Sequence, residues 1–177
     1  MSAITAARTG KKVCILEKLD KAGKKLLATG NGKCNFTNED MRVECFGGDE
    51  AFVRSVLDRF SVSDCLEFFQ SIGIYPKSKN GYYYPNSEQA SSVANALLYE
   101  LERFKVEILF ETSVTDILSS KDCVTIITSH GSFMGKNVIL ATGLLAAPKL
   151  GSDGSMFEIV KSMGHRFVPI LPTLCGF

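Results

Sequence analysis

The sequence predicts an α/β fold of the dinucleotide-binding type, in which a parallel sheet is combined with a β-meander crossover. The first observation is an apolar, β-rich run at residues 12–18 that contains the acid Glu17 near its end, as a buried parallel strand would. The second is the alternation of helical and strand patterns between residues 50 and 110. The third is residues 112–134, where the pattern changes to short strands separated by turns and predicts a small antiparallel meander.

The other elements follow from hydrophobic period and from residues that begin or end helices. Residues 23–38 hold three glycines and three asparagines without a regular period, which predicts a structured loop. Residues 76–85 predict a loop or a short strand, and Asn86 is the expected cap of the clearest helix. We expect helices over residues 1–8, 50–60, 63–72, 86–104 and 154–164, and further strands over residues 106–110 and 136–141.

The composition is that of a globular protein and argues against several classes. Of 177 residues, 45% are hydrophobic and 22% charged, and a net charge of +1 favours neither nucleic acid nor an anionic membrane as partner. No apolar run approaches the roughly 20 residues that span a bilayer. The six cysteines form no C-x-x-C pair and there are two histidines, so we expect no zinc site and a cytoplasmic location. Cys14 and Cys123 lie in strand-like runs, where we expect burial.

Glu17 stands where dinucleotide-binding folds place the acid that accepts hydrogen bonds from a ribose. In such folds the first strand leads into G-x-G-x-x-G, the following helix N-terminus holds the pyrophosphate, and the acid comes about 20 residues later. This chain has the acid without the glycine motif, so we expect the first strand and its phosphate loop to precede Met1. An ordinary acid at a strand end is the alternative interpretation of Glu17.

Several stretches, in order, carry a family resemblance: AITAARTGKKVCILEK, GKKLLATGNGKCNFTN, YYYPNSEQASSVANALL, VILATG, APKLGSDGS and KSMGH. Together they resemble the HI0933-like flavoproteins, also described as aminoacetone-oxidase-like FAD-dependent oxidoreductases, and the glycine loop is the most specific part. The resemblance implies an FAD-binding Rossmann-like fold of the glutathione-reductase type, here lacking its first strand. It also implies hydride transfer through the flavin N5, with NAD(P)H as a plausible electron donor and an unknown small-molecule substrate.

The resemblance also implies a domain division and marks two departures. Family proteins are longer, so we expect residues 1–168 to be part of an FAD-binding domain and residues 169–177 to begin a substrate domain. Leu144 and Met156 stand where the family usually has glycine, which places bulk where backbone would approach the flavin or pack closely.

The glycine loop is expected to face the flavin. Glycine permits close approach of backbone to a planar ring, and asparagine offers donors and acceptors to the ring edge. A P-loop is excluded, because that motif needs glycine and Ser or Thr where this chain has Leu27 and Cys34. The implied flavin-facing residues are Gly30, Asn31, Gly32, Lys33, Cys34 and Asn35. A tight surface loop is the alternative, and Cys34 is interpreted as a packing residue rather than as a catalytic thiol.

The remaining implied contacts surround the rest of the cofactor. Lys24 and Lys33 would neutralise pyrophosphate charge, with ordinary solvated loop lysines as the alternative. Val114 would place backbone groups against adenine, and it can at the same time be a core valine. The strand over residues 136–141 would end in small residues that let a cofactor approach. The implied set is completed by Glu17, Lys18, Ala141, Thr142 and Gly143. No catalytic residue and no metal ligand is assigned.

Two rival hypotheses remain open at this point. In the first, the chain is a truncated or split gene product without activity alone, whose exposed sheet edges favour association with another chain. In the second, it is an NAD(P)-binding module that uses no flavin. The glycine loop argues against the second hypothesis, because a plain nicotinamide module has no need for such an insertion.

Overall fold

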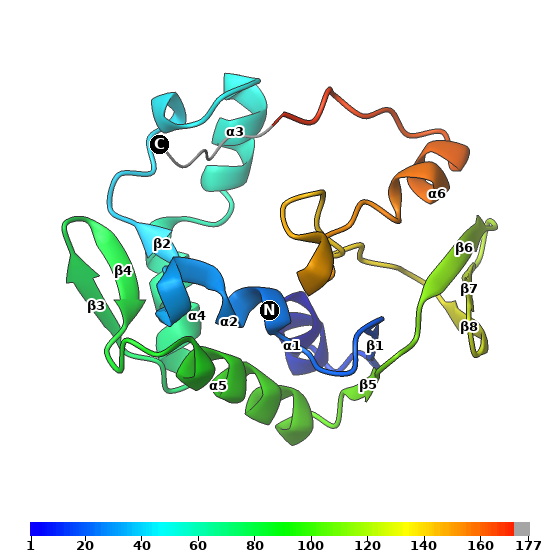
Figure 1. Ribbon diagram of the computed structural model, residues 1–177, viewed down its shortest axis with the longest axis horizontal. Coiled ribbons are helices and arrows are strands. Elements are labelled where there is room, and N and C mark those ends of the chain that lie inside the picture. Colours follow the sequence, from blue (N-terminus) through cyan, green and yellow to red (C-terminus); the bar gives the residue numbers. More distant parts are fainter. Residues whose placement is uncertain (172–177) are drawn as a thin grey trace. The chain divides into compact units, whose positions relative to one another are not determined.

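The computed structural model describes residues 1–171, and Figure 1 labels its helices and strands. The chain divides into two compact units. Unit 1 comprises Leu26–Lys105 together with Met1, and unit 2 comprises Ser2–Lys25 together with the chain from Val106 onward.

Unit 1 combines a small antiparallel sheet with helices. The sheet has the strand order β2-β4-β3, and its hairpin is visible in green in Figure 1. Asn80 and Gly81 join β3 to β4 with φ of 53° and 82°, the left-handed pair that a two-residue hairpin turn requires. After α2 (Lys24–Leu27), the elements are η1 (Thr29–Gly32), β2 (Thr37–Asn38), η2 (Val43–Cys45), α3 (Glu50–Leu57), α4 (Val62–Ser71), β3 (Pro76–Lys79), β4 (Tyr82–Pro85) and α5 (Ala90–Arg103).

The three predicted helices of unit 1 are present, and one predicted cap is wrong. Helix α4 begins at a capping box, in which Ser61 and Asp64 each accept a hydrogen bond from the other's backbone N–H. Helix α5 begins at Ala90, later than the predicted start at Asn86, and its N-cap Gln89 makes no side-chain capping bond. Glu88 explains the delay, because its φ of 52° is left-handed and cannot belong to a right-handed helix.

The core of unit 1 lies between the glycine loop and helices α4 and α5. Phe69 is buried, and its ring centroid lies 4.4 Å from that of Phe36. The buried residues of this cluster are Cys34, Cys65, Phe69, Ile74, Ala90 and Val93. The loop is therefore anchored in the same core that orders the helices.

Unit 2 contains the parallel strand pair and the meander. Strands β1 and β5 pair in parallel, with Cys14 opposite Glu107 and Leu16 opposite Leu109. Strands β6, β7 and β8 form an antiparallel sheet in that order (Figure 1). The predicted fold class, a Rossmann-like α/β fold with parallel strands and a β-meander, is confirmed. The elements are α1 (Ser2–Arg8), β1 (Cys14–Leu16), β5 (Glu107–Leu109), β6 (Val114–Ser119), β7 (Val124–Thr128), β8 (Gly131–Gly135), η3 (Pro148–Leu150) and α6 (Phe157–Ser162).

Three expectations for unit 2 are wrong: a strand over residues 136–141, the burial of Cys14, and the burial of Cys123, which is half-buried and precedes β7. Residues 136–141 form no strand, and Ile139 and Leu140 are exposed. A β-prone run becomes a strand only where a neighbour pairs with its backbone, and in the described residues the parallel sheet consists of β1 and β5 alone. For the same reason Cys14 is exposed instead of buried, because β1 has a partner strand on one side only.

Candidate functional site

The glycine loop turns through four left-handed backbone positions. Gly30, Asn31, Gly32 and Cys34 have φ of 56°, 53°, 81° and 59°. The Lys33 N–H donates to Gly30 O and the Cys34 N–H donates to Thr29 O, both at 3.1 Å, which closes the turn. Side-chain-bearing residues rarely adopt this conformation, so its use at Asn31 and Cys34 marks a loop whose shape is held by its surroundings.

Gly30 is the position where the loop needs glycine for reasons of space. A Cβ added to Gly30 would lie 2.7 Å from the backbone nitrogen of Asn35 and 3.5 Å from Cε1 of Tyr84. At Gly32 the same addition would meet nothing within 4 Å. The loop therefore folds back on itself at Gly30 and is open at Gly32, and we call this compact turn the cradle, because backbone without a side chain permits close approach by a planar group.

Cys34 serves the loop as a packing residue. Its side chain is 5% exposed and lies in the core cluster with Cys65 and Phe69. Burial raises the pKa of the Cys34 thiol, which disfavours the reactive thiolate. The geometry thus agrees with the packing interpretation rather than with a catalytic thiol.

Lys33 belongs to an ion-pair network that the sequence did not reveal. Its Nζ lies 3.1 Å from Oε2 of Glu88, whose Oε1 lies 2.8 Å from Nζ of Lys77. Hydrogen bonds from Lys77 and then Lys33 lower the pKa of Glu88 to about 2, so this carboxylate stays ionised near neutral pH. Beside it, a pocket of about 150 Å³ is lined by Lys33, Lys79, Asn80, Tyr82, Tyr84 and Glu88.

Glu17 follows β1 directly, at the carboxyl end of the parallel pair. Its N–H donates to Leu109 O and its own carbonyl accepts from the Thr112 N–H, both at 2.9 Å. Its Oε1 accepts a hydrogen bond from the Leu19 N–H at 2.9 Å, which holds the half-buried side chain in place. A carboxylate has more acceptor positions than this single bond uses, so it can accept further hydroxyl groups.

Two lysines predicted to contact the cofactor are held by carboxylates within unit 2. The Nζ of Lys18 donates to Oδ2 of Asp153 at 2.5 Å. Lys24 forms an ion pair with Asp20, four residues earlier. Each cation is therefore partly neutralised by the protein itself, and a phosphate would have to compete with these carboxylates.

The bond between Lys18 and Asp153 predicts a specific pH dependence. The Lys18 ammonium holds the pKa of Asp153 well below its ordinary value of 3.8. A depressed carboxyl pKa stabilises the fold above that ordinary value, and the contribution is lost as the pH falls below it. We expect Lys18→Gln to lower the free energy of unfolding by less than about 1 kcal/mol at about pH 6, because the pair is partly exposed, and the difference to shrink between about pH 4 and pH 2. Urea unfolding of both chains across this range measures it, and a difference independent of pH would contradict the pairing.

Val114 and Gly143, the other predicted residues of unit 2 with such contacts, are linked to the end of β1 by contacts between neighbouring residues. Val114 begins β6, two residues after Thr112, which bonds to Glu17. A Cβ on Gly143 would lie 2.5 Å from Oγ of buried Ser152, the residue before Asp153. The end of β1, the start of the meander and the 143–153 segment therefore meet in one part of unit 2.

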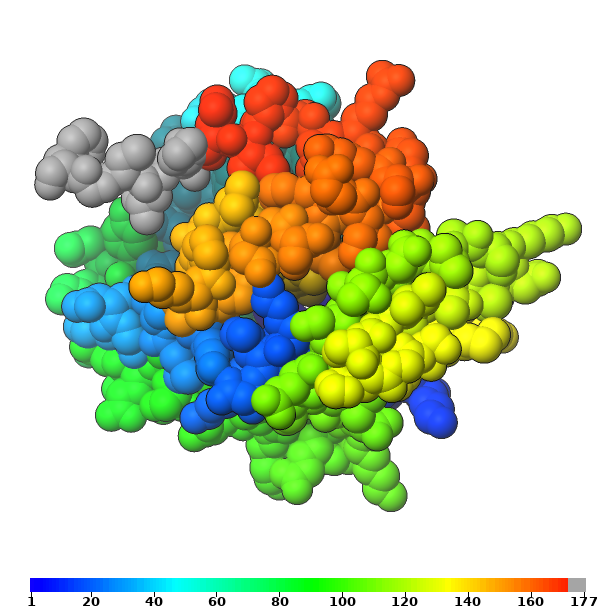
Figure 2. All heavy atoms as spheres, turned by 45° about the vertical axis from the view of Figure 1, so that its right-hand side comes forward, coloured from blue at the N-terminus to red at the C-terminus, as the bar shows by residue number. Residues whose placement is uncertain are grey.

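Ala141, Thr142 and Gly143 end no strand, contrary to the expectation. All three are exposed and lack regular structure. Figure 2 shows this part of the chain, in yellow-orange to orange, at the molecular surface. Gly143 has a φ of 74°, so the small residues here serve a turn that packs on Ser152.

The sequence predicted Lys33 of the loop and Lys18 after β1 as cofactor contacts but did not reveal their charged partners, Glu88 and Asp153. Glu88 lies 55 residues from Lys33, and Asp153 lies 135 residues from Lys18. No local pattern signals pairs so far apart. The sequence held a weak signal for the pocket. In a strand over GYYYP, Tyr82 and Tyr84 lie on the same face, because successive side chains of a strand point to opposite faces.

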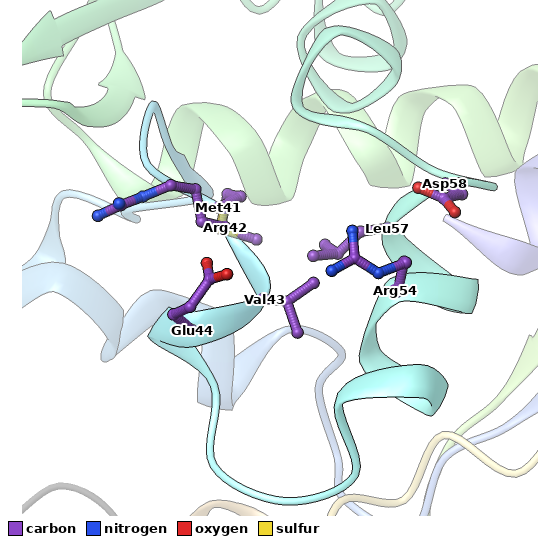
Figure 3. A pocket seen from close by; sticks show the side chains of 7 residues that line it. All are labelled: Met41, Arg42, Val43, Glu44, Arg54, Leu57 and Asp58. Carbon is purple, nitrogen blue, oxygen red and sulfur yellow. The ribbon is translucent and has the colours of Figure 1, made fainter.

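A second pocket lies in unit 1, away from the glycine loop. It has a volume of about 300 Å³ and is lined by Met41, Arg42, Val43, Glu44, Arg54, Leu57 and Asp58. Figure 3 shows side chains from the η2 segment facing those from α3, with the Arg42 guanidinium directed away from the helix. Asp40 binds that guanidinium at 2.6 Å and 2.9 Å. The two arginines and two acids balance in charge, and none of the predicted cofactor residues lines this pocket.

The described residues hold neither a metal cluster nor a spanning helix. No group of three or more His, Cys, Asp and Glu side chains within residues 1–171 is placed to bind a metal ion. No helix within the same range has the length and apolar character needed to cross a membrane.

A comparison with known protein families shows which family the chain belongs to. The family model described as "HI0933-like protein Rossmann domain" matches residues 1–176. The chain belongs to the HI0933-like family. The family domain supports FAD as the ligand of this HI0933-like chain, and the predicted family is confirmed.

Curated HI0933-like relatives are more than twice the length of this chain. The chain is 45% identical over 177 residues to the 3-dehydro-bile acid delta(4,6)-reductase of Clostridium scindens, covering 98% of this chain and 43% of that protein. It is 28% identical over 177 residues to the ribosomal RNA dihydrouridine synthase of Haemophilus influenzae, with 97% and 44% covered. The Escherichia coli protein of the same name is 25% identical over 172 residues, with 97% and 42% covered.

Solved structures show a distant likeness. The HI0933-like chain matches Thermovibrio ammonificans THI4 with a TM-score of 0.48 and 14% identity, covering 80% of this chain and 52% of that one. It matches NikD, an amino acid oxidase of nikkomycin biosynthesis, with a TM-score of 0.46 and 14% identity, covering 81% and 48%.

Proposed function

We propose that this HI0933-like chain supplies FAD-contacting residues of a flavin-dependent oxidoreductase. The observation that carries the proposal is the cradle at Gly30, where a Cβ would fall 2.7 Å from the Asn35 nitrogen. This approach lies within the loop and fixes a compact turn, while the adjacent Gly32 has nothing within 4 Å of where its Cβ would be, so the backbone at Gly32 is open to a planar ring. When bound, FAD supplies a nitrogen, N5, that accepts or delivers hydride.

The residues of the glycine loop have roles that match their chemistry. The amides of Asn31 and Asn35 offer both donors and acceptors to the edge of the flavin ring. Lys33 adds positive charge next to that edge, moderated by Glu88 at 3.1 Å. Cys34 anchors the loop in the core, so the loop is held in shape before any ligand arrives.

The residues at the end of β1 have a separate role at the adenosine end of FAD. Glu17 is half-buried and its carboxylate is oriented by the Leu19 N–H, which suits it to accept hydrogen bonds from ribose hydroxyls. Backbone groups at Val114 would contact adenine, because the segment before Val114 is bonded to Glu17 through Thr112. Lys18 and Lys24 would balance pyrophosphate charge in competition with Asp153 and Asp20.

The reaction we propose for the whole protein is the transfer of hydride to a small-molecule substrate. The relative at 45% identity is named a reductase, which favours the reductive direction. NAD(P)H would then be the electron donor. Because the chain spans less than half of its curated relatives, the substrate-contacting residues are expected in the remainder of a family protein.

Titration with FAD tests the proposal, with Glu17→Ala as the informative variant. We expect the visible absorption bands of bound flavin after gel filtration of the chain, and about tenfold to hundredfold weaker binding in Glu17→Ala, because hydrogen bonds to charged groups contribute about 1.5–3 kcal/mol. The control is Glu107→Ala, which removes an exposed glutamate from the neighbouring strand and should leave the affinity unchanged. A chain that binds NADPH but not FAD would replace the proposal with the flavin-free module.

A further inference from the structure

We propose that the pocket between the glycine loop and the β3–β4 hairpin is a binding site for a small oxyanion, a phosphate or a carboxylate. Its volume is about 150 Å³, and its lining combines Lys33 of the loop with Lys79, Asn80, Tyr82 and Tyr84 of the hairpin. This volume suits one anionic group with a small planar body. The proposal shares Lys33 with the flavin-facing loop and to that extent rests on the proposed function, whereas Lys79, Asn80, Tyr82 and Tyr84 belong to the hairpin, to which no cofactor role is assigned.

Charge is the first argument for an anion. Lys33 and Lys79 line the pocket together with one carboxylate, that of Glu88, which forms ion pairs with Lys33 and with Lys77. Within the described residues the Lys79 side chain has no ion pair or hydrogen bond, so at least one cation is not neutralised. Two lining lysines against the ionised carboxylate of Glu88 leave the lining positive near neutral pH; a further carboxylate, Glu39, binds Ser78 Oγ on the hairpin and is not among the lining residues.

Exchange is the second argument. The side chains of Lys33, Lys77 and Glu88 are 44%, 49% and 37% exposed, and ion pairs at such exposure are weak. An incoming oxyanion can therefore take over the ammonium groups without breaking a buried contact. Glu88 acts as an internal stand-in for that anion and keeps both lysines directed at one place.

Backbone geometry is the third argument. Glu88 holds a φ of 52°, and its N–H donates to Pro85 O at 2.8 Å. A left-handed glutamate is costly, and here it bends the chain so that the carboxylate reaches lysines on both the loop and the hairpin. Tyr82 and Tyr84 add aromatic surface and hydroxyl donors to the same wall.

Nuclear magnetic resonance of the backbone amides tests the site on the full chain. Sodium phosphate is added at constant ionic strength, and the amides of residues 30–34 and 79–82 are followed. We expect saturable shifts at these residues, lost in Lys79→Gln and kept in Lys121→Gln, which removes an exposed lysine from the turn after β6. Shifts that rise linearly with phosphate, or that persist unchanged in Lys79→Gln, would overturn the proposal.

A second variant separates an anion site from a merely structural network. Glu88→Gln removes the competing carboxylate, so we expect phosphate to bind roughly fivefold more tightly. A structural role for Glu88 predicts the reverse, with weaker or absent binding, and that result would also overturn the proposal.

Two further probes identify the source of the anion. Tighter binding of sodium pyrophosphate than of sodium benzoate would support the site with a cofactor diphosphate as its occupant. Tighter binding of benzoate would support it with the carboxylate of a substrate, whose planar body the tyrosines would contact. Saturable binding of neither probe would count against the site.

Discussion

We expect the Gly30→Ala chain to lose FAD binding, with an affinity at least about a hundredfold lower than that of the unmodified chain. The new Cβ would lie 2.7 Å from the Asn35 nitrogen, a distance at which backbone must move. Residues 30–35 would then open away from the shape that the flavin is proposed to contact. Alanine at a φ of 56° also carries a strain of about 1–2 kcal/mol.

Gly73→Ala is the matched control for this experiment. Gly73 lies in the same unit with a φ of 82°, and a Cβ there would meet nothing within 4 Å. Both variants therefore carry the left-handed strain, and only Gly30→Ala adds the collision. Flavin absorbance after gel filtration gives the affinity, and urea unfolding gives the stability of each. Equal FAD affinity in the two variants would contradict the proposal that the loop shape at Gly30 is needed for FAD binding.

The second large effect is expected in the core of unit 1. Phe69→Ala should lower the free energy of unfolding by about 3–5 kcal/mol, because the side chain is fully enclosed and its loss leaves a cavity. Phe69 is 4% exposed, stacks on Phe36 and shares its cluster with Cys34 of the glycine loop. The same cavity should therefore loosen the loop and weaken FAD binding.

Phe52→Ala makes the same chemical change at a solvent-exposed site of helix α3. Phe52 is 68% exposed, so we expect a change within about 0.5 kcal/mol. Urea unfolding followed by circular dichroism compares the two variants. A loss in Phe69→Ala no larger than that in Phe52→Ala would show that this cluster does not hold the unit together.

The helices were predicted because their signals are local, whereas the Ser61 cap of α4 and the Asn80-Gly81 hairpin turn were missed although they too are encoded in a few contiguous residues. Ser61 and Asp64 form the capping box at the start of α4, and four residues of sequence contain the whole motif. Asn80-Gly81 encodes the tight hairpin turn in two residues. The start of α5 was misplaced because a left-handed Glu88, held by its ion pairs with Lys33 and Lys77, follows from contacts outside the helix.

Residues 136–141, which were predicted to form a strand and do not, show where local signals fail. Its apolar, β-branched composition is favourable, yet strand formation depends on a neighbour that pairs with its backbone. In the described residues no such neighbour stands beside it, and Ile139 is 66% exposed. Composition alone could not show whether residues 136–141 have a neighbouring strand to pair with.

The sequence by itself determined the family, the glycine loop and the acid at the end of β1, because each is written in contiguous residues. Glycine and asparagine density signals left-handed backbone, and the structure has it at Gly30, Asn31 and Gly32. Only the tertiary structure decided how the charged residues are paired. Lys18 meets Asp153, and Lys33 with Lys77 meets Glu88, because the folded chain brings together side chains that no local period relates.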